Sequence, residues 1–297
     1  MNSIPASELI LNQDGSIYHL NLHPDEIAHT ILTVGDPGRV PRVSRHFDEI
    51  ELRKEKREFV THTGRIGRKR LTVISSGIGP DNIDIVLNEL DALVNIDFES
   101  RQVKRERTVL NIIRIGTSGG LQAGIPVGSL VAARFGLGFD NLLHFYNYQP
   151  SLPEAELFDE LQNFLEYAGQ LPVTPYVTEG SQNLLDGIAT DMHHGITITA
   201  PGFYGPQGRR LRLPPRLQDV NLKNLANFEF QKVKITNFEM ETAAIYGLSR
   251  LLGHRALSCN ALLVNRPKGA FSDDPKELEN KLIETVLTRI SESELID

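Results

Sequence analysis

The sequence has 297 residues, of which 40% are hydrophobic and 23% charged, and its formal net charge is −7. This balance is typical of a globular protein with a large buried core, and the negative charge argues against nucleic acid as a partner, because a phosphate backbone needs a basic face. Cys259 is the only cysteine, which excludes an internal disulfide and a metal site built on several thiolates.

The N-terminal stretch MNSIPASELILNQDGS lacks the basic start and apolar run of a signal peptide. No stretch approaches the roughly 20 apolar residues of a membrane span. We therefore expect a cytoplasmic protein with no membrane partner.

In the first half of the chain, short apolar runs alternate with helical patterns. In chain order the patterns predict a strand at 30–35, a hairpin at 57–76 with its turn region at 61–69, a helix at 81–94, and strands at 109–116 and 127–133. Asp81 or Asn82 is the expected cap of that helix. The charge runs 53–58 and 101–107 are expected to be solvated turns, Arg57 excepted.

The second half continues the alternation. It predicts helices at 153–168 and 180–188, strands at 195–200 and 232–238, a helix at 241–253, a strand at 256–264 and a closing amphipathic helix at 274–294. No repeat or linker interrupts the chain. These patterns predict an α/β fold with a central mixed sheet flanked by helices, as a single domain spanning residues 1–297.

Polar and glycine-rich segments follow several of these strands. VGDPGRV (34–40) forms a tight turn that exposes backbone N–H groups beside Arg39, which suits an anion, although Asp-Pro-Gly is also an ordinary turn. RIGTSGG (114–120) places Arg114 on an apolar strand, where it is costly unless an anion or carboxylate meets it. Neither this segment nor SSGIGPDN (75–82) carries the GxGxxG pattern, so a dinucleotide site is not expected.

Two further segments carry groups able to bind a nucleoside. In APGFYGPQGRR (200–210), Phe203 offers an apolar wall, and Gln207 with Arg209 matches a heterocycle edge, the alternative being a flexible surface turn. In NFEMETAAIYG (237–247), Glu239 and Glu241 are natural acceptors for the hydroxyls of a sugar diol. The alternative is that they cap the following helix, which is more plausible for one of them than for both.

Taken in order, the segments YHLNL, VGDPGR, REF, SSGIG, RIGTSGG, FY..QGR, NFEMET and LLVNR resemble the nucleoside phosphorylase family, and within it the uridine phosphorylases. The resemblance runs from residue 18 to residue 267. It implies reversible phosphorolysis of uridine to uracil and ribose-1-phosphate, in pyrimidine salvage. It implies no organic cofactor and no catalytic metal, with inorganic phosphate as the co-substrate.

The resemblance also implies a role for each matching residue, and Arg114, Thr117 and Glu241 are expected to carry catalysis. The residues expected at phosphate are Gly35, Arg39, Arg114 and Thr117, with Arg57 supplied by a neighbouring subunit. The residues expected at ribose are Glu239, Met240 and Glu241, with His19 crossing from the partner. The residues expected at the base are Phe203, Gln207, Arg209 and, in support, Arg266.

The residues that cross from the partner imply that a homodimer is the minimum active unit. Whether three dimers then form a hexamer is left open. Some relatives bind a monovalent cation near the glutamate that follows the REF arginine, which is Glu58 here. The different sequence around Asn82 leaves that cation open.

Related purine enzymes usually carry a base-site aspartate where this chain reads ALLVNRPKG. Its absence argues against the alternative of a purine nucleoside or methylthioadenosine enzyme. A hydrolytic nucleosidase would not need the phosphate-binding arginines Arg39, Arg57 and Arg114. A non-catalytic nucleoside-binding protein is the remaining alternative.

Overall fold

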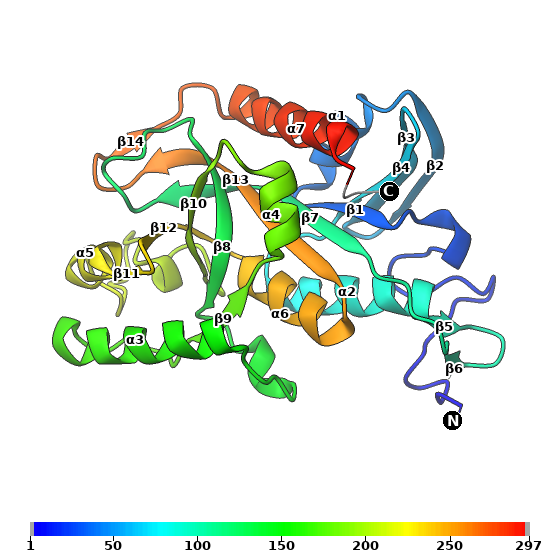
Figure 1. Ribbon diagram of the computed structural model, residues 1–297, viewed down its shortest axis with the longest axis horizontal. Coiled ribbons are helices and arrows are strands. Elements are labelled where there is room, and N and C mark those ends of the chain that lie inside the picture. The colour runs from blue at the N-terminus through cyan, green and yellow to red at the C-terminus, as the bar shows by residue number, and fades with distance from the viewer. Residues whose placement is uncertain (1–2, 295–297) are drawn as a thin grey trace.

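The computed structural model describes residues 3–294, which form one large mixed β-sheet with helices on both faces (Figure 1). The strands are β1 Thr30–Val34, β2 Glu49–Lys56, β3 Phe59–Ile66, β4 Lys69–Ser75, β5 Ile96–Asp97, β6 Gln102–Val103, β7 Asn111–Gly120, β8 Leu130–Gly138, β9 Tyr176–Glu179, β10 His193–Thr199, β11 Glu229–Phe230, β12 Val233–Glu239, β13 Arg255–Asn265 and β14 Ala270–Phe271. The α-helices are α1 Val40–Ser44, α2 Pro80–Asn95, α3 Leu152–Ala168, α4 Gln182–Ile188, α5 Asp219–Asn227, α6 Thr242–Leu252 and α7 Pro275–Glu292. Short 3-10 turns are η1 Pro24–Glu26, η2 Pro37–Arg39, η3 Leu142–Phe145 and η4 Gly205–Gln207.

The sheet contains 12 strands in the order β11-β12-β10-β8-β13-β7-β1-β4-β3-β2, with β9 beside β8 and β14 beside β13. Strand β1 runs parallel to β4 and β7, β7 runs parallel to β13, and β2, β3 and β4 form an antiparallel meander. An additional antiparallel pairing of β12 with β7 closes the strands β7, β13, β8, β10 and β12 into a ring. The sequence-based prediction of a mixed sheet flanked by helices is confirmed.

Alternating side chains of the central strands pack on opposite faces, as the pleat of a strand requires. Ile31 and Ile112 pack with α2 and α6, whereas their neighbours Leu32 and Ile113 pack with α1, α4 and α7. Figure 1 shows α7 on one side of the sheet and α2 and α6 on the other. The strands therefore read as continuous apolar runs because they are covered on both faces. Among residues 3–294, no helix has the length and apolar character needed to cross a membrane.

The charge run 53–58 is not a solvated turn, which corrects the sequence-based expectation. Most of it lies on β2, whose residues alternate between exposed and half-buried, and Lys54 pairs with Glu26 at 2.7 Å. In the run 101–107, Arg101 donates to the carbonyl of Ile4 at 2.8 Å and so fastens the N-terminal segment, while residues 104–107 are exposed as expected.

The turn predicted at 61–69 is mostly strand, because β3 and β4 pair directly from Thr61 to Lys69 around a tight turn. The predicted cap of α2 is also wrong. The N-cap is Gly79, with φ of 105°, and Pro80 begins the helix. Pro80 fits the first helical position because it has no N–H to satisfy. The strands β2 and β9 and the helices α1 and α5 were not predicted.

The carboxyl ends of β1, β4 and β7 meet at one edge of the sheet, because these strands are parallel and adjacent. The antiparallel pairing of β12 with β7 brings Phe238 opposite Gly119 at that same edge. Residues far apart in the sequence are thereby gathered at the carboxyl ends of parallel strands, where α/β sheets commonly bind ligands.

Candidate active site

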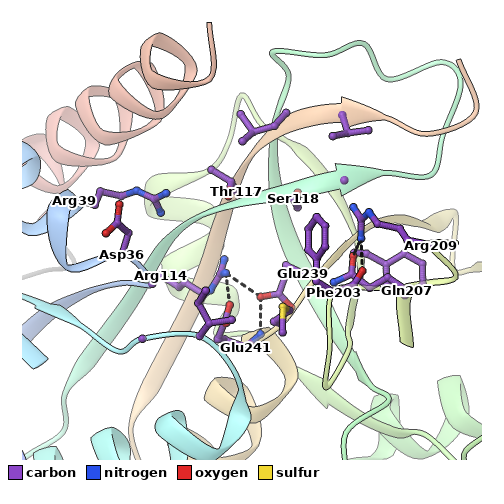
Figure 2. A pocket seen from close by; sticks show the side chains of 18 of the residues that line it. Asp36, Arg39, Arg114, Thr117, Ser118, Phe203, Gln207, Arg209, Glu239 and Glu241 are labelled. Atoms are coloured by element: carbon purple, nitrogen blue, oxygen red, sulfur yellow. Dashed lines mark hydrogen bonds and ion pairs between the residues drawn. The ribbon is translucent and has the colours of Figure 1, made fainter. Parts of the chain in front are cut away.

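A cavity of about 560 Å³ opens at this edge of the sheet, in the size range of small-molecule sites. Its wall is formed by the turn after β1, the second half of β7, the end of β12, the loop 203–209 and the end of β13. Figure 2 shows Arg39 and Asp36 at one end, Arg114 with Glu241 and Glu239 in the middle, and Phe203, Gln207 and Arg209 at the other end.

Arg39 ends the turn η2, which Asp36 stabilises by accepting the N–H of Gly38. Arg39 is 7% exposed, and its guanidinium donates to the carbonyl of Ile115 at 3.1 Å and pairs with Glu279 of α7 at 2.9 Å. Its buried Nε has no partner among the described residues. Burial lowers the pKa of Arg39. A buried guanidinium with a spare donor at the wall of a cavity is suited to binding an anion.

Arg114 lies at the centre of the cavity and is 6% exposed. Its Nη2 donates to Glu241 at 2.5 Å and lies 3.2 Å from Glu239, while its Nη1 donates to Asn260 at 2.8 Å. Burial opposes the charge of the guanidinium, but Glu239 and Glu241 together raise the pKa of Arg114 above its ordinary value. The arginine therefore stays charged in the interior.

Glu239 and Glu241 have different roles in the fold. The Glu239 carboxylate accepts the backbone N–H groups of Glu241 and Thr242, at 2.9 and 3.0 Å, and the hydroxyl of Thr199 at 2.7 Å. It thus caps α6, which is the alternative considered for one of the two glutamates. Its oxygens are occupied by these donors although the residue lines the cavity.

Glu241 is held by different partners. Its Oε1 accepts the N–H of Gly79, the residue before α2, at 2.9 Å, and its Oε2 accepts from Arg114. Burial is the main cause that raises the pKa of Glu241, against the opposing effect of Arg114. Met240 is half-buried between the two glutamates and lines the same cavity.

The other end of the cavity is a stack of Arg209 on Phe203. The Arg209 guanidinium lies 3.8 Å from the ring centroid of Phe203 and donates to the side-chain oxygen of Gln207. Arg266 donates to the main-chain carbonyl of Gln207 at 2.5 Å and so supports the loop from behind the cavity wall. Burial, reinforced by the nearby charge of Arg266, lowers the pKa of Arg209 to about 10.

The structure brings most of the predicted site residues together in this one cavity. They are Gly35, Arg39, Arg114, Thr117, Phe203, Gln207, Arg209, Glu239, Met240 and Glu241. The hydroxyl of Thr117 has no hydrogen-bond partner within residues 3–294 and remains available to a ligand.

Arg57 and His19 lie outside this cavity. Arg57 is exposed in the turn between β2 and β3, with φ of 55°, and His19 is held by Glu89 of α2, which accepts from its Nδ1 at 2.6 Å. Both were expected to act in a neighbouring subunit, and those roles stay predictions. Glu58 lies beside Gly77 and Asn82, and the cation expected there stays a prediction.

Sequence reasoning missed three residues that shape the site, namely Asp36, Asn260 and Glu279. Asp36 belongs to the Asp-Pro-Gly turn, and from the sequence it was considered only as a residue that forms this turn. Asn260 interrupts the apolar run of β13, and a polar residue buried on a central strand was the signal that it needed a partner.

The sequence model of the phosphorylase superfamily matches residues 29–292. The chain belongs to the phosphorylase superfamily. This superfamily member is 30% identical over 269 residues to a uridine phosphorylase of Thermococcus kodakarensis, an alignment that covers 90% of this chain and 83% of the relative. It is 26% identical over 279 residues to a uridine phosphorylase of Haemophilus influenzae, covering 92% and 96% of the two chains.

A solved structure of a Trypanosoma brucei nucleoside phosphorylase, described as showing uridine phosphorylase activity, superposes on this superfamily member with a TM-score of 0.84. The two are 30% identical, and the match covers 96% of this chain and 100% of that one. A purine nucleoside phosphorylase of Streptococcus suis is also similar, at 26% identity over 241 residues. The alignment covers 81% of this chain and 83% of the relative.

Proposed function

We propose that this protein catalyses the reversible phosphorolysis of uridine to uracil and ribose-1-phosphate. The observation that carries the proposal is the arrangement of the cavity. A central buried arginine, Arg114, separates a cationic turn at Arg39 from a base-sized end formed by Phe203, Gln207 and Arg209. The similarity to uridine phosphorylases over nine-tenths of the chain supports the same substrate.

Phosphate binds between Arg39 and Arg114, with the hydroxyl of Thr117 and the backbone at Gly35 completing the contacts. Charge-assisted hydrogen bonds of this kind contribute about 1.5–3 kcal/mol each. Arg57 of a second subunit adds the remaining cation, so a homodimer is the smallest active unit, and a hexamer is compatible with it.

The ribose hydroxyls donate to Glu241, whose carboxylate is buried and already oriented by Gly79 and Arg114. Glu239 contributes indirectly, because its oxygens already accept the backbone N–H groups of Glu241 and Thr242 at the start of α6. As the glycosidic bond breaks, the sugar becomes oxocarbenium-like, and the adjacent phosphate stabilises that positive charge. His19 of the second subunit closes the ribose side.

The base stacks on Phe203 and is read by Gln207 and Arg209. These donors stabilise the negative charge that the leaving uracil gains, and Arg266 keeps the loop in place. Where β13 borders the cavity its side chains are Leu263 and Val264, which cannot protonate a purine nitrogen. A purine would leave Gln207 and Arg209 unpaired, and such mismatches can discriminate by about 10⁴-fold.

The test is a panel of nucleosides assayed for free base with and without phosphate. Uridine should be cleaved only with phosphate, and adenosine, inosine, methylthioadenosine and cytidine should be poor substrates. Release of uracil without phosphate would indicate a nucleosidase, preferential cleavage of a purine would indicate the purine alternative, and binding without turnover would indicate a non-catalytic protein. We place this activity in pyrimidine salvage in the cytoplasm, where the lone thiol of Cys259 stays reduced.

A further inference from the structure

Asn260 is a buried amide on β13 that contacts the central arginine of the cavity. It lies opposite Gly116 of β7 in the parallel register of the two strands, and it is 0% exposed. Its Oδ1 accepts from Nη1 of Arg114 at 2.8 Å. Asn260 is therefore a polar residue within an apolar strand whose oxygen is used by a cation of the site.

The orientation of this amide is fixed by a closed circuit of hydrogen bonds. Its Nδ2 donates to the hydroxyl of Ser258 at 3.2 Å, and that hydroxyl bonds to the hydroxyl of Thr242 at 2.7 Å. The backbone N–H of Thr242 donates to Glu239, which lies 3.2 Å from Arg114. Because Nδ2 is directed towards Ser258, Oδ1 must face the guanidinium.

Gly116 supplies the space that this arrangement needs. A Cβ on Gly116 would lie 2.8 Å from Nη2 of Arg114 and closer still to Cζ and Nη1. The guanidinium thus passes directly over the backbone of its own strand, and only the absence of a side chain allows it to reach Asn260.

We propose that Asn260 is the positioning residue for Arg114, and that its value to the reaction lies in being a neutral acceptor. It orients the phosphate-binding guanidinium without reducing its charge. This inference rests on the phosphate role of Arg114 in the proposed function.

The charge balance of the cluster explains why neutrality matters. Arg114 already faces two carboxylates, Glu239 and Glu241, so the cluster is formally negative before an anion arrives. An aspartate in place of Asn260 would keep the acceptor geometry but add a third carboxylate. Phosphate carries one to two negative charges near neutral pH, and a further buried negative charge would repel it.

The test compares Asn260→Asp and Asn260→Ala with Asn111→Asp, which makes the same amide-to-carboxylate change at the start of β7, outside the cavity lining. Two readouts are needed: the KM values for phosphate and uridine, and the shift in Tm produced by inorganic phosphate alone. We expect Asn260→Asp to raise the KM for phosphate by about 100-fold with a much smaller change for uridine. We expect Asn260→Ala, which adds no charge, to raise it about 10-fold, and Asn111→Asp to leave it unchanged.

Equal changes in the two KM values, or a phosphate-induced shift in Tm that both Asn260 variants retain, would overturn the proposal. Asn260→Ala keeps it falsifiable should the aspartate variant not fold. The Tm readout does not depend on uridine cleavage. If the wild type binds phosphate and the variants lose that binding, the inference holds even where the proposed substrate is wrong.

Discussion

Gly116→Ala provides a direct test of how tightly the central arginine is held. The new methyl group would lie 2.8 Å from Nη2 of Arg114 and closer to its Cζ and Nη1, whereas ordinary van der Waals contact begins at 3.4 Å. Nη2 must therefore move by at least ~0.6 Å and its neighbours further, because the strand backbone cannot yield alone. Such a shift lengthens the bonds of Arg114 to Asn260 and Glu241, which now measure 2.8 and 2.5 Å.

The size of the effect follows from two terms. Misplacement of a positioning group by about 1 Å typically lowers the rate about 100-fold, and loss of one charge-assisted bond to phosphate corresponds to about 10- to 150-fold in affinity. We expect kcat/KM for phosphate to fall about 100-fold. Overpacking costs about 1–3 kcal/mol, so Tm should fall by a few degrees while the variant remains folded.

The assay measures initial rates of uracil release over a range of phosphate concentrations at saturating uridine. Gly124→Ala is the matched control, because a Cβ there meets no atom within 4 Å, and its kinetics should equal those of the wild type. A Gly116→Ala enzyme whose KM for phosphate and kcat stay within about threefold of the wild type would refute the reasoning, since the guanidinium would then tolerate displacement.

Three further predictions follow from the contacts of the site. Glu241→Gln should lower kcat/KM for uridine about 100-fold. Glu239→Gln should mainly lower the free energy of unfolding, by about 1–2 kcal/mol, because the cap of α6 is lost. Equal losses of stability in the two variants would contradict this division of roles. The folded-state pKa of Glu241 is raised above 4.5. Its carboxylate is therefore protonated, and loses its negative charge, as the pH falls through that higher value. The kcat/KM for uridine at saturating phosphate should therefore show an acid limb above pH 4.5 that Glu241→Gln removes, and a profile that is flat down to pH 4.5 would count against this role. Co-expression of Arg57→Ala and Arg114→Ala chains should restore about a quarter of wild-type activity, since half of the random dimers then hold one intact site; no recovery would exclude sharing across the interface.

The elements that the sequence predicted well are those whose pattern is set by burial. The apolar runs of β1 and β7 and the helical spacing of α2 follow from contact with the core, so periodicity alone identifies them. Strand β2 was missed because it is an edge strand with charged side chains, a composition that resembles a turn. Helix α5 was missed because it buries little beyond Leu222 and Leu225.

The site was predictable where function places glycine and charge directly after strands, as at Gly35, Arg39 and Arg114. It was not predictable where a partner is distant in sequence and ordinary in type. Asn260 is separated from Arg114 by 146 positions, and Glu279 from Arg39 by 240. Their roles exist only once the strands and α7 are in place. The apolar run of β13 indicated that Asn260 needs a polar partner but not which residue that partner is.

The ion pair between Arg39 and Glu279 also bears on how the protein is made. Glu279 belongs to α7, so a nascent chain that has not yet emerged as far as this helix has a turn at 36–39 whose arginine lacks its counter-charge. The orientation that Glu279 gives to the Arg39 guanidinium should consequently appear only when α7 packs against the sheet. We expect a translation product cut short before α7 to leave Arg39 without this partner and the apolar side chains under α7 uncovered.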